Sequence, residues 1–246
     1  MTTRRLFQHL FWLILLVQGY PFSAQCQWKR IPGPESVGFA AYFYQGQNAI
    51  FAFSGYGGLF KSVDGGTTWN LCGFGDQPIG SIAEYNNELV VCGESYAYRS
   101  YNGGNTWSDF SQGLPPSNEG TWGVWRVIKD KDVYFAGTIH GLYRYSEQAQ
   151  KWDSVSLGRT VIMDLEISGT TLIAACPDED GIIISKNQGL TWTRVGPDLT
   201  VFSLQVSDDR IYAETFTGIY VSGDEGLSWT PLEYGLSKTE LQVFSV

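Results

Sequence analysis

Basic residues are scarce in this chain of 246 residues, which has 16 lysines and arginines against 25 aspartates and glutamates and a net charge of −9. Such an acidic chain repels phosphate backbones and anionic lipids, and no basic stripe occurs along it. We therefore expect neither nucleic-acid binding nor a polybasic contact with a membrane.

Histidine is rarer still, with two residues in the chain. His9 falls in an N-terminal apolar segment and His140 stands alone, so the sequence indicates no metal site and no Ser-His-Asp arrangement. No phosphate-binding glycine loop is recognisable either. We expect no metal and no cofactor.

Cysteine is also sparse, and none of the four residues follows a CxxC or His-paired spacing. Cys92 and Cys176 lie in apolar runs typical of buried strands, which favours free thiols. An exported chain permits disulfides, however, so the disulfide state of Cys72, Cys92 and Cys176 stays open.

Long apolar runs are missing except near the N-terminus, where residues 10–17 follow Arg4 and Arg5. This layout is typical of a secretory signal peptide, and the run is too short to span a bilayer. We expect cleavage after Ala24, which divides the chain into a signal peptide (1–24) and one domain (25–246). The mature protein would be secreted, periplasmic or at the cell surface, without membrane insertion. Cys26 leaves lipid attachment as an alternative.

Glycine (29 residues) and aromatic residues (15%) are plentiful, and helical periodicity is nearly absent after residue 30. One eight-residue pattern, Ser-x-Asp/Asn-x-Gly-x-Thr/Ser-Trp, occurs at residues 62–69, 100–107, 185–192 and 222–229. A fifth copy at residues 145–152 keeps only the tryptophan. The five tryptophans are 38, 45, 40 and 37 residues apart. A turn signature with a period of about 40 residues predicts stacked four-stranded units, as in a β-propeller.

The pattern predicts a tight hairpin between two strands. The Asp or Asn side chain is expected to accept hydrogen bonds from amides two residues on, and the Gly to supply a positive φ. The Trp would open the outer strand and cover the hairpin. The residues with this structural role are Ser62, Asp64, Gly66, Trp69, Ser100, Asn102, Gly104, Trp107, Ser185, Asn187, Gly189, Trp192, Ser222, Asp224, Gly226 and Trp229.

This pattern resembles the Asp-box, the repeat shared by bacterial sialidases, sortilin-type receptors, xyloglucan hydrolases and propellers of the photosystem II stability/assembly factor type. The resemblance implies an all-β propeller of four-stranded blades, in which the box braces a hairpin away from the binding face. It gives no reason to infer photosynthesis.

Five complete blades and a partial sixth are predicted, from a six- or seven-bladed parent truncated at the C-terminus. The innermost strands are expected at residues 38–43, 79–85, 124–129, 162–167 and 201–206, and the outermost at 67–71, 105–110, 151–155, 190–195 and 227–232. Residues 27–31 resemble an outermost strand and residues 243–246 an innermost one, so they would form the partial blade.

The sialidase resemblance implies three substrate-binding arginines and an Arg-Ile-Pro motif. Arg30 begins such a triplet, but its match to an outer strand places it far from a central pocket. Only Arg126 and Arg159 fall near the centre, so an active sialidase is not favoured. Asp164 and the acidic run 178–180 are the acids near the binding face, which leaves a truncated sialidase-like or xyloglucanase-like glycoside hydrolase as the alternative function.

A binding role is better supported, because aromatic and acidic residues gather in the loops expected around the mouth of the central channel. The candidate binding residues are Tyr56, Tyr96, Trp122, Trp125, Arg126, His140, Asp164, Glu179 and Asp180. Alignment of the innermost strands puts Ser81, Arg126, Asp164, Ser203 and, in the partial blade, Ser245 at the same third position, where they should converge. We expect an exported, non-catalytic propeller that binds a glycan or an extracellular protein.

Overall fold

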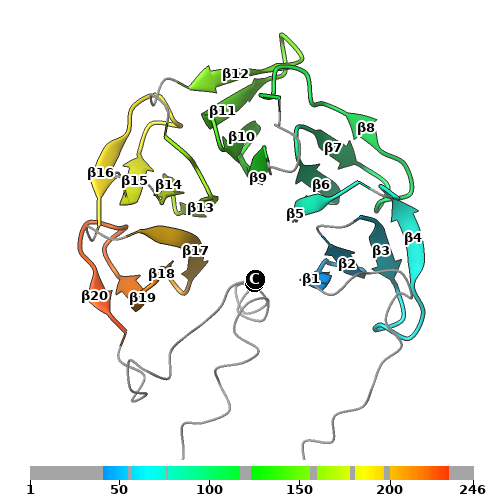
Figure 1. Cartoon of the computed structure of the whole chain (residues 1–246), viewed down its shortest axis with the longest axis horizontal. Coiled ribbons are helices and arrows are strands. Elements are labelled where there is room, and N and C mark those ends of the chain that lie inside the picture. The colour runs from blue at the N-terminus through cyan, green and yellow to red at the C-terminus, as the bar shows by residue number, and fades with distance from the viewer. Residues whose placement is uncertain are drawn as a thin grey trace, which may run out of the picture.

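The computed structural model describes residues 41–54, 57–75, 77–116, 123–155, 160–177, 181–196 and 200–232. These residues form twenty strands in five four-stranded sheets, with every pair of neighbouring strands antiparallel. Figure 1 shows the sheets arranged as blades along an arc, with the first strand of each blade nearest the centre and the last at the periphery. The expected all-β propeller architecture of five blades is confirmed.

The strands follow one another in chain order within each blade. Blade 1 contains β1 (Ala41–Gln45), β2 (Ile50–Ser54), β3 (Leu59–Ser62) and β4 (Asn70–Gly73). Blade 2 contains β5 (Ile79–Tyr85), β6 (Glu88–Gly93), β7 (Ala97–Ser100) and β8 (Ser108–Asp109). Blade 3 contains β9 (Val124–Asp130), β10 (Val133–Thr138), β11 (Gly141–Ser146) and β12 (Lys151–Val155). Blade 4 contains β13 (Asp164–Ser168), β14 (Thr171–Cys176), β15 (Gly181–Ser185) and β16 (Thr193–Val195). Blade 5 contains β17 (Val201–Ser207), β18 (Arg210–Thr215), β19 (Gly218–Ser222) and β20 (Thr230–Pro231).

Four of the five outermost strands are shorter than the sequence predicts, and β8 and β20 have two residues each, whereas β12 has the predicted bounds. In four blades the hairpin holds the chain out of the ladder up to its tryptophan, so pairing begins only after that residue. The strands expected at residues 27–31 and 243–246 lie outside the described residues.

The core lies in the seams between blades, because each sheet buries both faces against its neighbours. Every residue of β6 and β14 is buried. Four apolar clusters fill the seams from blade 1 to blade 5, centred on Leu59, Tyr134, Leu165 and Ile182. Each fully buried large apolar side chain contributes about 1.5–3 kcal/mol to folding, so the stacking of blades supplies most of the stability.

Hydrogen bonds within the repeated hairpins explain their sequence. In residues 62–69, the Asp64 carboxylate accepts hydrogen bonds from the hydroxyl of Ser62 and from the amide and hydroxyl of Thr68, and the Gly66 amide donates to Ser62 Oγ. The bonded amide lies four residues beyond the aspartate, so the expected spacing of two residues was wrong. Gly66 has a φ of 89°, as the turn requires.

Asparagine serves the same geometry in residues 100–107. Asn102 Oδ1 accepts from the Thr106 amide at 2.9 Å, while its Nδ2 donates to the Thr106 hydroxyl at 2.8 Å. Asn102 therefore contacts the amide and the hydroxyl of Thr106, just as Asp64 contacts those of Thr68. The carboxylate differs in charge, and the hydrogen bonds from the Thr68 hydroxyl and amide lower the pKa of Asp64 to about 2.

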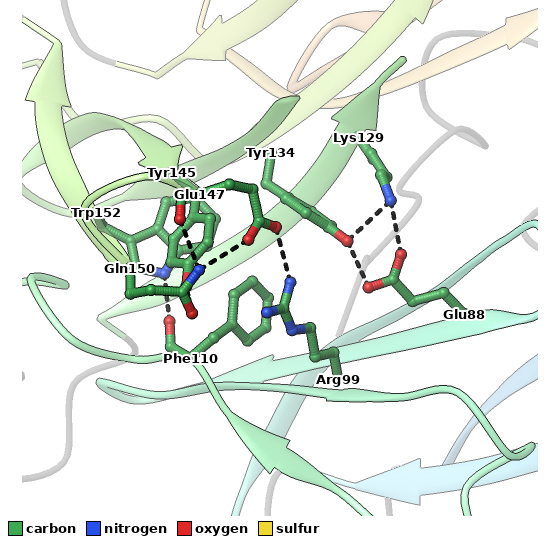
Figure 2. Close-up of polar contacts among 9 residues, drawn as sticks. All are labelled: Glu88, Arg99, Phe110, Lys129, Tyr134, Tyr145, Glu147, Gln150 and Trp152. Atoms are coloured by element: carbon green, nitrogen blue, oxygen red, sulfur yellow. Dashed lines mark hydrogen bonds and ion pairs between the residues drawn. The ribbon is translucent and has the colours of Figure 1, made fainter. Parts of the chain in front are cut away.

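The degenerate copy in blade 3 is held differently, as Figure 2 shows. Trp152 is 2% exposed and its Nε1 donates to the carbonyl of Phe110 in blade 2 at 2.6 Å. Arg99 of blade 2 reaches across to Glu147 at 2.9 Å, with its guanidinium 5.2 Å from the Phe110 ring and 5.7 Å from that of Tyr145. The degenerate hairpin keeps hydrogen bonds of its own, from Gln150 Nε2 to the carbonyl and the side chain of Glu147, and adds these contacts with blade 2.

The three described cysteines are free thiols, with Cys92 and Cys176 buried and Cys72 half-buried. Burial raises the pKa of Cys92 to about 12 and that of Cys72 to about 11. In the part of the chain that the structure describes, no helix is long and apolar enough to cross a membrane.

Candidate functional site

The antiparallel order of strands gives the blades two different ends. Each innermost strand starts at the end that carries the connections between blades and the turns between second and third strands, which we call the loop face. The repeated hairpins and the turns between first and second strands lie at the opposite end, the hairpin face. The innermost strands β1, β5, β9, β13 and β17 border the centre of the arc (Figure 1).

Arg126 occupies the centre near the loop face, where it pairs with Gly137 two residues before the turn at 139–140. Its Nη2 donates to Glu166 Oε1 at 2.8 Å, and its Nε lies 3.5 Å from Asp164 Oδ1. Burial alone would lower the pKa of Arg126, but the carboxylates of Asp164 and Glu166 raise it above its ordinary value. The guanidinium therefore stays charged, and the three groups together carry one negative charge.

Asp164 also joins blade 4 to blade 5. Its Oδ2 accepts from the Leu204 amide at 2.8 Å and from Ser203 Oγ at 3.3 Å, and its Oδ1 accepts from the Leu165 amide at 2.8 Å. Three of the residues aligned at the third position, Arg126, Asp164 and Ser203, are thus brought together across blades 3, 4 and 5. Ser81, also aligned there, is 6% exposed in blade 2.

Glu166 was missed by the sequence analysis, although a signal for it exists. It follows Asp164 by two residues on β13, and side chains two apart on a strand share a face. Arg126, which faces Asp164 from blade 3, accordingly contacts Glu166 as well. The two acids hold Arg126 in place between them.

Tyr96 lies on the loop face in a cluster of rings between blades 1 and 2. Its ring stacks on Phe74 at 6.2 Å, and Phe74 in turn contacts Tyr98 and Trp107. The Tyr96 hydroxyl donates to the carbonyl of Pro78, and burial raises the pKa of the phenol. Tyr96 therefore packs the blade top and offers a ligand only the edge of this cluster.

Other candidates on the loop face are more accessible. His140 is exposed in the turn between β10 and β11, and Trp125 is half-buried beside Arg126 in β9. Phe216, in the turn between β18 and β19, is 81% exposed and packs edge-on against Phe202 at 4.3 Å. The candidates Tyr56, Trp122, Glu179 and Asp180 lie outside the described residues, as do Arg159 and Ser245.

No cluster of three or more potential metal ligands occurs within the described ranges. Among these residues, the carboxylates near the centre are Asp164 and Glu166, both paired with Arg126, and Glu214, whose pKa is raised by burial. The geometry is that of a charged cluster on the innermost strands β9 and β13, near the loop face.

A five-bladed arc of this kind defines the protein as a β-propeller in fold. Among solved structures it is similar to YCF48 bound to D1 peptide, at 16% identity over 82% of this chain and 72% of that one, with a TM-score of 0.58. It is also similar to PorZ, a surface component of the type-IX secretion system of Porphyromonas gingivalis, at 15% identity over 78% of this chain and 28% of that one (TM-score 0.58).

A third similar structure is the GH74 xyloglucanase from Xanthomonas campestris, at 16% identity over 76% of this chain and 36% of that one, with a TM-score of 0.57. This chain spans about a third or less of the length of PorZ and of the xyloglucanase. At such identities the similarity shows the fold alone. No protein-family model matches the sequence. No curated protein matches it at a significant level.

Proposed function

We propose that this protein is a non-catalytic propeller that binds a polypeptide segment across its loop face, with Arg126 as the polar anchor. The observation that carries the proposal is the geometry of Arg126, whose side chain is 30% exposed near the loop face while Glu166 and Asp164 fix its position. A guanidinium has five N–H donors, and the bond to Glu166 uses one of them. Donors therefore remain for the backbone carbonyls of a ligand.

The surroundings of Arg126 support a binding role over catalysis. Asp164 accepts two backbone amides besides facing Arg126, so its carboxylate is committed to joining blades. Glycoside hydrolysis needs two carboxylates that act on the same bond from either side of a cleft, whereas Asp164 and Glu166 both face one guanidinium. The exposed ring of Phe216 and the imidazole of His140 add contact area of the kind that anchors protein ligands.

A peptide is favoured over a glycan for two reasons. Arg126 lies between two acids, so the cluster has one net negative charge, which disfavours acidic glycans. The fold is also shared with a YCF48 structure that contains a bound peptide. The proposed setting is extracytoplasmic, as the N-terminal apolar segment indicates.

Arrays of peptides and of oligosaccharides, probed with the full chain, test the proposal. Arg126→Lys keeps the charge that holds Asp164 and Glu166 but loses the planar fork. Phe216→Ala removes an exposed ring without opening the core. Each variant should lower peptide binding at least tenfold while its melting temperature stays close to that of wild type. Peptide binding unchanged in both folded variants would exclude the loop face as the site.

The same arrays separate the other ligand class. If oligosaccharides bind, peptides do not, and Arg126→Lys abolishes the signal, then the site is a glycan site. Release of reducing sugar from a bound oligosaccharide would instead support the hydrolase alternative.

A further inference from the structure

A cavity of about 330 Å³ opens at the hairpin face, in the seam between blades 1 and 2. This face is opposite to that of the proposed peptide site. The walls of the cavity include Ala49, Phe51 and Lys61 of blade 1 and Glu84, Leu89 and Tyr101 of blade 2. Its volume falls within the range of roughly 300–1,000 Å³ that is typical of ligand sites.

The corresponding positions in the seam between blades 2 and 3 are filled by side chains. Phe51 of blade 1 pairs with Lys61, and Val90 of blade 2 pairs with Arg99; each partner is the residue directly before the repeated hairpin, so Phe51 and Val90 are equivalent. Two residues before them, Ala49 in blade 1 is therefore equivalent to Glu88 in blade 2. In the same way, Glu84 pairs with Leu89 as Lys129 pairs with Tyr134 in the next blade. The two seams can therefore be compared position by position.

In the seam between blades 2 and 3 these positions hold an ion pair (Figure 2). Lys129 Nζ donates to Glu88 Oε2 at 2.7 Å and to the Tyr134 hydroxyl at 2.9 Å, and that hydroxyl donates to the second oxygen of Glu88. Glu88 is 3% exposed, so the three groups fill the seam and satisfy one another.

The seam between blades 1 and 2 keeps one charge and lacks its counterpart. Glu84 occupies the position equivalent to Lys129, so a carboxylate replaces the ammonium group. Ala49 occupies the position equivalent to Glu88, so a methyl group replaces the carboxylate. Glu84 Oε2 accepts one hydrogen bond, from the backbone amide of Gln47 at 2.7 Å. Within the described residues, no Lys or Arg lies within ion-pair distance of Glu84. Lys61, which also lines the cavity, donates from its Nζ to the Gly103 carbonyl at 2.7 Å.

The remaining described seams have no charged residue at these two positions. Val133 and Ile167 occupy the two positions between blades 3 and 4 and pack on the same apolar cluster. Between blades 4 and 5 the positions hold Thr171, which is bonded to Glu225, and Val206, which packs on Ile211. An unmatched pair of a carboxylate and a methyl group thus coincides with the hollow seam.

We propose that the cavity binds a basic side chain of a partner protein, with the ammonium or guanidinium group on Glu84. The aliphatic stem of that side chain would lie along Phe51 and Leu89, which form the apolar part of the wall. Tyr101, 63% exposed at the border of the cavity and with the Arg99 guanidinium 5.8 Å from its ring centroid, adds aromatic contact area for the ligand. Lys61 would meet a carbonyl of the same ligand. The net charge of −9 favours the approach of a basic partner.

Binding of two capped tripeptides to the full chain tests this site by titration calorimetry. The probes are acetyl-Gly-Lys-Gly-amide and the same peptide with norleucine, which keeps the stem and removes the charge. The lysine peptide should bind at least tenfold more tightly than the norleucine peptide, and its affinity should fall as salt is raised.

Three variants complete the test. Glu84→Gln should weaken binding of the lysine peptide at least tenfold. Ala49→Lys should supply the missing cation internally, which blocks the peptide and leaves the melting temperature unchanged or higher. Asp208→Asn, which changes the same charge in an exposed turn of blade 5, should have no effect.

Equal affinity for the two peptides, no binding of either, or unchanged affinity in folded Glu84→Gln would overturn the proposal. So would binding of a neutral oligosaccharide that Tyr101→Ala abolishes and the lysine peptide does not compete. Should Ala49→Lys fail to fold, the Glu84→Gln and Asp208→Asn comparison decides alone. Because this site and Arg126 lie on opposite faces, Arg126→Lys should leave lysine-peptide binding intact, so the two proposals fail independently.

Discussion

Truncating Trp152 to alanine should destabilise the protein by about 3–5 kcal/mol, the most severe effect that we expect from any hairpin tryptophan. The indole is 2% exposed and touches the rings of Phe110 and Tyr145 with centroids 5.5 and 5.2 Å away. Its removal leaves a void between blades 2 and 3. It also strands the Phe110 carbonyl, and a buried polar group without a partner costs about 1–3 kcal/mol, which moves the expected loss toward the upper end.

Trp192 is the matched control, because it occupies the same position in an intact hairpin. It is half-buried, and its Nε1 donates to Gly189 within the same hairpin at 3.1 Å. Trp192→Ala should therefore cost at least about 1 kcal/mol less than Trp152→Ala. Trp152→Phe, which keeps a ring and loses the N–H donor, should fall between wild type and Trp152→Ala.

Urea unfolding followed by far-UV circular dichroism measures these differences, and thermal melts give a second estimate. For a domain of this size each kcal/mol lowers the melting temperature by roughly 2–4 °C, so Trp152→Ala should melt at least about 6 °C below wild type. The reasoning would be refuted if Trp152→Ala and Trp192→Ala proved equally destabilising. The degenerate hairpin would then not depend on its tryptophan for contact between blades.

Two further predictions concern charge. Hydrogen bonds from the residue four positions on lower the pKa of Asp64 and of Asp224 from the usual 3.8 to about 2. Because the folded state holds the carboxylates ionised, they stabilise it fully above about pH 4, and this stabilisation is lost as the pH falls toward 2. Urea titrations from pH 2 to 5 should show this acid-dependent loss in wild type and a flatter profile in the double variant Asp64→Asn/Asp224→Asn, and equal slopes would contradict the assignment. Glu88→Ala should cost about 3 kcal/mol by leaving the Lys129 ammonium without its carboxylate, and adding Lys129→Met should recover most of the loss. A loss below about 0.5 kcal/mol in Glu88→Ala, measured by urea unfolding, would mean that the ion pair contributes nothing.

The arrangement of blades could be predicted from the sequence because the hairpin pattern is local. Asp64 and Gly66 act on atoms within four residues of themselves, so each copy marks its own place in the chain without knowledge of the rest of the fold. The lengths of β8 and β20 were not predicted, because the hairpin keeps the chain out of the sheet through Trp107 and Trp229, residues that were expected to lie within these strands.

The site was predictable in part for a related reason. Aligning the repeats put Arg126 and Asp164 at equivalent positions of their innermost strands. The structure brings them together because innermost strands of adjacent blades lie side by side, with equivalent positions at similar heights. The commitment of the Tyr96 hydroxyl to the Pro78 carbonyl was not predictable. That contact depends on how the chain enters β5, which no repeat in this sequence specifies.

The seams between blades differ in kind from the hairpins. Hairpin positions recur because each must satisfy the same backbone atoms, whereas seam positions need only match the residue facing them in the next blade. Glu88 with Lys129 and Val133 with Ile167 are two such matches, and they share no chemistry. Since any matched pair preserves the stack, the mismatch of Ala49 with Glu84 leaves a carboxylate that has a backbone amide as its partner but no cation among the described residues, with a cavity beside it. In a propeller built this way, positions that break the matching between blades are where a ligand can replace a side chain, and aligning seam positions across repeats finds them from the sequence once the register is known.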